Sequence, residues 1–222
     1  PIVQFLRQEG RLQLQVRASV GNEVRLTLTE RGRQSALDVL KVCGYTGPAP
    51  VPIDVYSRVV LGQTIPRRSL ARAKVNYAYQ DIIMAQDLCD RLGVAMASGR
   101  AIFIYGPAGS GKTYIASRLI AALPGEVLIP HSVVVNGKII RVFDAAVHET
   151  IDLLGGNHRL LLAQGYDARF ALCERPMIIV GGELTEDMLD VKFNSSTAEY
   201  TAPLQMKANG GVLVIDDLGR QR

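Results

Sequence analysis

Three glycines, a lysine and a threonine stand in residues 106–113, GPAGSGKT, at the spacing G-x-x-x-x-G-K-[ST]. Glycine adopts backbone conformations that a Cβ forbids, so successive N–H groups can turn inward around phosphate oxygens. A lysine at the end of such a loop reaches the outer phosphates, and the threonine hydroxyl reaches Mg²⁺. This stretch, called the phosphate loop below, therefore predicts a binding site for a nucleoside triphosphate.

Every residue of the loop and the one after it is a predicted site residue. The predicted cofactor-binding residues are Gly106, Pro107, Ala108, Gly109, Ser110, Gly111, Lys112, Thr113 and Tyr114. Lys112 is also predicted to be catalytic, and Thr113 to hold the metal ion. The alternative is a glycine-rich turn that binds nothing, which the flanking sequence disfavours.

The flanking sequence predicts the elements that position this loop. Residues 101–105, AIFIY, are apolar and predict a buried strand, and residues 114–121 have the composition of a helix that closes at Pro124 and Gly125. The helix would point the positive end of its dipole at the phosphates. A strand, a glycine-rich loop and a helix in this order are the context that the motif requires.

A second candidate site lies in residues 210–217, GGVLVIDD, where an apolar run ends in two carboxylates. The run predicts a parallel strand buried on both faces, and ligands bind at the carboxyl ends of such strands. Asp216 is predicted to hold Mg²⁺ opposite Thr113. Asp217 is predicted to be the general base that activates water for attack on the γ-phosphate.

Composition sets limits on the whole chain. The 222 residues are 48% hydrophobic and carry a net charge of +4, and residues 1–75 hold 12 Lys and Arg against five Asp and Glu. A basic partner surface is therefore expected in the N-terminal part. Three distant cysteines suggest neither disulfides nor zinc, which favours a reducing cytoplasm, and no apolar run is long enough to span a membrane. The first residue is Pro1, so we expect an upstream segment to be missing.

The N-terminal part predicts a hairpin. Residues 11–17 and 24–29 alternate apolar and polar side chains, which indicates two strands with one buried face, and residues 36–43 have helical spacing up to Gly44. With the short apolar segment 2–6, this order resembles the C-terminal half of a winged-helix domain. That resemblance implies DNA contacts around the wing, for which the candidates are Arg17, Arg25, Arg31 and Arg33. A solvated face or a protein-contact surface is the alternative.

The central elements are predicted as follows. The proline-rich residues 47–52 predict a linker, followed by a basic stretch at 67–74. Residues 76–97 predict one amphipathic helix ending at Ser98 and Gly99, and residues 126–130 and 176–182 predict strands. Asn136-Gly137 predicts a tight hairpin, which we interpret as a surface decoration rather than a substrate contact. The histidines at 131, 148 and 158 are interpreted as ordinary polar residues, and residues 183–187 as a helix start.

Residues 76–222 resemble the AAA+ ATPases, with GPAGSGKT as Walker A and VLVIDD as Walker B. The segment KANGGVLVIDDLG is also similar to the corresponding segment of sigma-54 activators, and IDDLG to helicase loaders and transposition ATPases. The chain differs in having Asp217 where most of the family has Glu. It also ends soon after Walker B, so we expect it to be truncated, without the sensor strand between the two motif strands, the arginine finger and the helical lid.

Together these patterns predict an α/β P-loop NTPase of AAA+ type, a parallel sheet with flanking helices, behind a small α+β winged-helix-like domain. The predicted domains are a partial winged-helix module at 1–46, a linker with a basic stretch at 47–75, and the nucleotide-binding core at 76–222. The expected function is Mg²⁺-dependent ATP binding and hydrolysis coupled to remodelling of a macromolecule. The resemblance implies a homo-oligomeric ring, and DNA is a candidate partner. The alternatives are an ATP-responsive DNA-binding or scaffold module with negligible turnover, and another phosphate-loop enzyme such as a nucleotide kinase.

Overall fold

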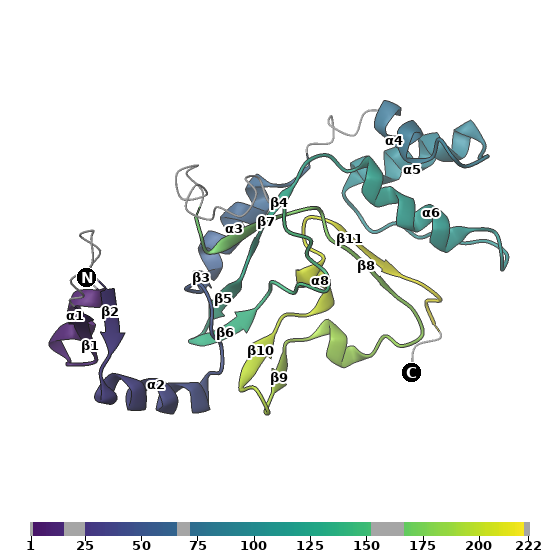
Figure 1. Cartoon of the computed structure of the whole chain (residues 1–222). Coiled ribbons are helices and arrows are strands. Elements are labelled where there is room, and N and C mark those ends of the chain that lie inside the picture. Colours follow the sequence, from purple (N-terminus) through teal and green to yellow (C-terminus); the bar gives the residue numbers. More distant parts are fainter. Residues whose placement is uncertain (1, 16–24, 66–71, 152–166, 220–222) are drawn as a thin grey trace. The chain divides into compact units, whose positions relative to one another are not determined.

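A computed structural model describes residues 2–15, 25–65, 72–151 and 167–219 (Figure 1). The chain divides into two compact units. The first comprises Pro1–Thr46 with Asn194–Glu199, and the second comprises Gly47–Phe193 with Tyr200–Arg222. The identities proposed for the domains, a winged-helix module and an AAA+ core, stay predictions.

The first unit contains the predicted hairpin between two helices. Its elements in order are α1 (Ile2–Gln8), β1 (Leu12–Gln15), β2 (Arg25–Leu28) and α2 (Glu30–Val42). The strands are antiparallel, with Leu12 opposite Leu28 and Leu14 opposite Leu26, so the hairpin and the helix after it are confirmed. The predicted buried face is wrong, because Leu14 is 41% exposed and Leu28 51%. The wing itself, including Arg17, lies outside the described residues.

Thr29 fixes the start of α2. Its hydroxyl accepts a hydrogen bond from the Gly32 N–H at 3.0 Å and donates one to the Gly10 carbonyl at 2.7 Å. An N-cap of this kind satisfies a backbone donor that the helix cannot satisfy itself. Gly32 has no substitute here, because a Cβ would lie 2.0 Å from the Arg11 carbonyl oxygen.

The larger sheet of the second unit has the strand order β3-β5-β6-β10-β9. Its strands are β3 (Val51–Pro52), β5 (Ser132–Val135), β6 (Lys138–Arg141), β9 (Lys192–Asn194) and β10 (Glu199–Thr201). β5 and β6 form the predicted tight hairpin, with positive φ at Asn136 (49°) and Gly137 (76°). Interpreting this hairpin as a surface decoration is wrong, because Val133 and Ile140 are buried in the core.

Val51 and Pro52, which the proline pattern places in a linker, instead form β3, and the chain continues as helix α3 (Ile53–Gly62) within the predicted linker region 47–75. Val51 is fully buried and pairs in parallel with Val133 of β5. A two-residue strand tolerates Pro52 at its end, since proline removes only one donor from the ladder.

A second pair of strands completes this part of the core. β4 (Val127–Pro130), which confirms the predicted strand at 126–130, is antiparallel to β7 (Phe170–Cys173). These strands, the larger sheet and α3 bury one apolar cluster. Its buried members are Val51, Tyr56, Val127, Ile129, Val133, Ile140, Val142, Phe170, Cys173 and Ala202.

The single helix predicted over 76–97 is wrong: two helices, α4 (Arg72–Ala78) and α5 (Gln86–Ser98), are separated by a turn. α5 ends as predicted, with Gly99 in the left-handed conformation (φ 64°). The helices enclose a separate apolar cluster that also takes in the helix after the phosphate loop. Its buried members are Val75, Ala78, Tyr79, Cys89, Leu92, Leu119 and Ala122. In the portions of the chain that are described, every helix is too short or too polar to cross a bilayer.

Candidate nucleotide site

The segment before the phosphate loop, residues 101–105, is not the strand that its sequence predicts. Ile102 and Ile104 pack against the helical cluster that contains Leu119, whereas Phe103 is 72% exposed and Tyr105 83%. The alternation is that of a strand, but none of the described strands pairs with this segment. The predicted buried strand is therefore wrong, since its two aromatic side chains are exposed.

The phosphate loop itself has the backbone that its glycines predict. Gly109 (φ 75°) and Gly111 (φ 79°) adopt left-handed conformations that disfavour other residues. Gly111 directly precedes α6 (Lys112–Arg118), which continues as the 3₁₀ helix η2 (Leu119–Ala122). The helix thus ends just before Pro124 and Gly125, as predicted.

The candidate metal-binding strand, β11 (Val212–Ile215), is parallel to β8 (Met177–Val180), and the two lie side by side in Figure 1. The strands predicted within residues 176–182 and in the apolar run before Asp216 are both confirmed. Burial of β11 on both faces is wrong, because its residues are half-buried and Ile215 is 38% exposed. Among the described strands β11 pairs with β8 alone, so one side of it is not covered by a neighbouring strand.

One hydrogen bond joins the two predicted motifs. The Thr113 hydroxyl, at the start of α6, donates to Asp216 Oδ2 at 2.6 Å. This contact lies between the two residues that were predicted to hold Mg²⁺. The pKa of Asp216 is lowered, first by the Thr113 hydroxyl, then by the Asp217 N–H, with a further contribution from the positive charge of Lys112. The Asp216 carboxylate is therefore ionised at neutral pH beside the loop.

Lys112 folds over the phosphate loop. Its ammonium donates to the carbonyl oxygens of Gly106, at 3.3 Å, and Pro107, at 2.9 Å. The charge is thus held at the loop's own rim, where phosphate oxygens would be bound. The positive charge of Lys112 also contributes to the lowered pKa of Asp216.

Asp217 lies next to this contact. Its backbone N–H donates to Asp216 Oδ1 at 3.0 Å, and its φ of 49° is uncommon for a residue with a side chain. This turn follows β11 at once, at the end of the strand nearest the phosphate loop. The role of Asp217 as a general base stays a prediction.

Tyr114, the last predicted cofactor-binding residue, contacts Arg118 one turn later on α6. The Arg118 guanidinium lies 5.2 Å from the centre of the ring and donates to the hydroxyl at 2.8 Å. Asp81 lies 3.9 Å from the same guanidinium. Tyr114 remains 50% exposed, so its ring is available at the edge of the site.

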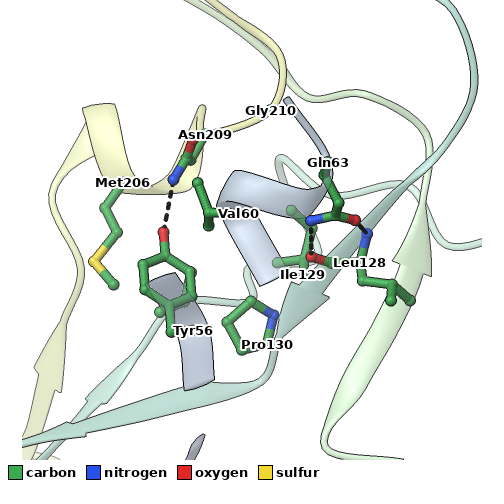
Figure 2. A pocket seen from close by; sticks show the side chains of 10 residues that line it. Tyr56, Val60, Gln63, Leu128, Ile129, Pro130, Met206, Asn209 and Gly210 are labelled. Atoms are coloured by element: carbon green, nitrogen blue, oxygen red, sulfur yellow. Dashed lines mark hydrogen bonds between the residues drawn. The ribbon is translucent and has the colours of Figure 1, made fainter. Parts of the chain in front are cut away.

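Sequence reasoning missed the residues that hold the start of β11. Asn209, just before this strand, donates to the Tyr56 hydroxyl at 2.9 Å (Figure 2). Both residues line a pocket of about 20 Å³, which is room for one or two water molecules. None of the residues of the phosphate loop lines this pocket. Tyr56 lies on α3, far away in the sequence, so no local pattern could have indicated the contact.

His148 is not the ordinary polar residue that we expected, because it is 2% exposed. Its Nδ1 accepts the Asp144 N–H at 2.9 Å, so Nε2 carries the proton and faces the Lys207 carbonyl at 2.9 Å. The Lys207 ammonium in turn donates to Asp144 at 2.7 Å. Burial lowers the pKa of His148. These partly buried contacts link residues 144–148 to helix α8 (Leu204–Lys207), which precedes β11.

Comparison with known proteins supports the assignment to a broad class. Residues 78–139 match the family model of magnesium chelatase, subunit ChlI, an AAA+ family. The match supports an AAA+ P-loop ATPase, and with it ATP-dependent activity and the use of nucleotide and Mg²⁺ in general. The mixed α/β architecture is consistent with such a domain. A search of curated proteins gives no significant match.

The matched range contains the phosphate loop and ends at the hairpin of β5 and β6. It does not reach β11 or the two aspartates. The geometry around Asp216 is therefore an observation independent of the family match.

Proposed function

We propose that this chain binds ATP with Mg²⁺ between the phosphate loop and the end of β11, and that it hydrolyses the γ-phosphate. The hydrogen bond from Thr113 to Asp216 carries the proposal, because it brings together side chains 103 positions apart in the sequence. A glycine-rich turn without a ligand gives no reason for an exposed threonine to meet a carboxylate at 2.6 Å. The family match over residues 78–139 supports the same conclusion.

The donor atoms of this site fit Mg²⁺. Hydroxyl and carboxylate oxygens are the ligands that this ion prefers, and the ion is usually held by few protein groups together with water and substrate phosphates. Thr113 and Asp216 would hold it. Bound Mg²⁺ would neutralise charge on the phosphates during their transfer. The loop N–H groups and Lys112 would bind the β- and γ-phosphates, and Asp217 would orient and deprotonate the attacking water.

We propose remodelling of a macromolecule, by a ring of identical subunits, as the purpose of hydrolysis. This step rests on the AAA+ relationship and not on the geometry. Duplex DNA is the candidate partner of the first unit, whose exposed arginines include Arg31 and Arg33. Glu9 lies 4.0 Å from Arg31, and Glu30 lies 3.9 Å from Arg33. Exposed ion pairs of this length are weak, about 0–1 kcal/mol, so phosphates can replace the glutamates.

A second candidate is a nucleotide-dependent switch that binds ATP and turns it over negligibly. The observation in its favour is Asp217, whose carboxylate is one methylene shorter than the glutamate usual at this position. A shorter side chain holds the attacking water less closely. In this alternative ATP acts by stabilising one conformation of the chain.

The test is ATP affinity and turnover of the parent chain, with and without Mg²⁺. Lys112→Ala removes the phosphate-binding charge, and Lys138→Ala, on the exposed end of the β5–β6 hairpin, is the matched control. The proposal predicts ATP binding and turnover in the parent and the control, and weakened binding in Lys112→Ala. Binding without turnover, at concentrations that allow assembly, would favour the switch. Equal ATP affinity in all three chains would contradict both candidates.

A further inference from the structure

Arg175 connects the two segments that carry the candidate site. It lies in the turn between β7 and β8, outside both motifs. Its Nε donates to the Pro124 carbonyl at 2.7 Å, and its Nη1 donates to the Gly210 carbonyl. Pro124 follows the helix that begins at the phosphate loop, and Gly210 precedes β11. One guanidinium therefore joins the far end of the phosphate-loop helix to the start of the strand that leads to Asp216.

Two glycines beside Arg175 allow a backbone arrangement that other residues would disfavour. Gly210 has φ 82°, and a Cβ on Gly211 would lie 1.9 Å from the Pro176 carbonyl oxygen. That carbonyl accepts the Val212 N–H at 2.9 Å, the first ladder bond of β11 with the β8 side. The two glycines thus let β11 begin directly against the residue that follows Arg175.

The chemistry of Arg175 suits a bridge between carbonyls. The side chain is partly buried, and burial lowers its pKa. Within the described part of the chain, no carboxylate lies within ion-pair distance of it. A buried cation requires compensating hydrogen bonds, and here the two backbone oxygens provide them. Arginine presents its donors in a rigid planar fork, so it can hold two carbonyls at a fixed separation, whereas the single ammonium of lysine cannot.

We propose that Arg175 is a positioning residue that sets the register of Thr113 against Asp216, and with it the affinity of the site for Mg²⁺. This inference rests on the proposed function. The helix and the strand are rigid elements with Arg175 at one end of each and the Thr113–Asp216 contact at the other. Loss of the bridge frees the two elements to slide, while the phosphate loop, a local structure, keeps its shape.

The experiment compares Arg175→Met, which keeps an unbranched stem and removes both donors, with Arg175→Lys, which keeps the charge. The matched control is Arg169→Met, just before β7, where a half-buried arginine pairs with Asp167 at 2.6 Å. Three quantities are measured: ATP affinity in EDTA and in Mg²⁺, kcat and KM for ATP, and hydrogen exchange of residues 112–118 and 212–216 without nucleotide.

The proposal predicts that Arg175→Met binds ATP in EDTA as the parent does. The factor by which Mg²⁺ raises the ATP affinity should be roughly tenfold smaller in this variant than in the parent. The KM for ATP in Mg²⁺ rises by a similar factor, because it follows the weakened affinity, and both segments exchange faster. Arg175→Lys shows the same losses, and Arg169→Met behaves like the parent. If Arg175 merely fills space, Arg175→Lys at a parent-like melting temperature keeps the full Mg²⁺ gain and slow exchange, which would overturn the proposal.

Two further outcomes are decisive. If Arg175→Met does not fold, Arg175→Lys alone decides by the same criteria. If the parent binds no ATP, the proposed function fails, whereas hydrogen exchange still tests the bridge: faster exchange in both segments supports it, and unchanged exchange overturns it.

Discussion

The hydroxyl of Thr113 donates to Oδ2 of Asp216 at 2.6 Å. Thr113 lies in the first turn of α6, after a glycine-rich loop, and Asp216 directly follows β11, which belongs to a separate pair of parallel strands. Neither element determines the position of the other locally, so their meeting is a property of the tertiary structure. Two oxygen donors suited to Mg²⁺ thereby share the rim of a loop suited to phosphates.

Asp217→Asn should lose turnover and keep ATP binding. An amide of the same size cannot accept a proton, and general-base catalysis contributes about 10²–10⁴-fold to rate. Asp217→Glu is the matched variant, which introduces the longer carboxylate usual in AAA+ ATPases and should retain or raise turnover. Steady-state phosphate release is the measurement. Hydrolysis by Asp217→Asn at the parent rate would show that another group activates the water.

Gly211→Ala should destabilise the fold. A methyl group at this position would lie 1.9 Å from the Pro176 carbonyl oxygen, so β8 and β11 must separate. Overpacking of this kind costs about 1–3 kcal/mol of the free energy of unfolding. Gly62→Ala, at the end of α3 where no atom lies within 4 Å, is the control. Denaturant titration should give Gly211→Ala a lower midpoint of unfolding than the parent, and Gly62→Ala a midpoint close to that of the parent. Equal midpoints for the two variants would contradict the close approach.

Stability should fall as the pH is lowered below about 6.5. Burial lowers the pKa of His148 below its ordinary value of 6.5, so the folded state favours neutral imidazole. The stabilising contribution is complete above the unfolded pKa and is lost as the pH falls through the folded one. His131 is lowered for the same reason. In urea titrations from pH 7.5 to 5, the free energy of unfolding should depend less on pH in His148→Gln than in the parent. It should depend least on pH in the variant that also carries His131→Gln.

If the slope of the free energy of unfolding against pH were unchanged in both histidine variants, other groups would take up the protons on unfolding and the prediction would be wrong. Asp38→Asn serves as a control for charge, because this exposed residue pairs, among the described residues, with neighbours on its own helix, Gln34 and Lys41.

The full chain should bind duplex DNA through the first unit, with affinity that falls steeply as salt rises. Each phosphate contact contributes about −0.9 to the slope of log K against log salt concentration. Replacing Arg31 and Arg33 together by alanine should therefore reduce the slope by about two. Arg58→Ala, an exposed arginine paired with Asp54 on α3, controls for net charge. Absent or salt-insensitive binding would remove DNA as a partner.

The sequence predicted elements whose signals are local. Asn136-Gly137 between β-branched runs specified a hairpin, since these residues adopt positive φ readily. The apolar run before Asp216 specified a strand, and the glycine spacing of residues 106–113 specified a loop. In each case the chemistry of a few neighbouring residues decides the conformation.

Features that depend on distant partners could not be predicted. Residues 101–105 form an apolar run that suits a buried strand, but a strand also needs a neighbour, which no pattern within five residues reports. Val51 follows prolines typical of a linker, yet it is buried because β5 pairs with it. The role of Arg175 could not be predicted for another reason. Its partners are backbone carbonyl oxygens, which every residue carries, so they leave no pattern of residue types in the sequence.

The most direct test of the central claim is a double-mutant cycle on Thr113 and Asp216, read as the gain in ATP affinity that Mg²⁺ provides. Thr113→Val removes the hydroxyl at constant shape, Asp216→Asn removes the charge, and Thr113→Ser is the control that keeps the hydroxyl. If both side chains hold one ion, the factor by which Mg²⁺ raises the ATP affinity should be roughly 10- to 100-fold smaller in Thr113→Val and in Asp216→Asn than in the parent. The ATP affinity in EDTA should be retained.

In that case the double variant should lose little more than either single one, because the two side chains act on the same ion. Thr113→Ser should resemble the parent. A parent-like Mg²⁺ gain in both single variants, or losses that add fully in the double variant, would contradict a single Mg²⁺-ATP site built from the phosphate loop and β11.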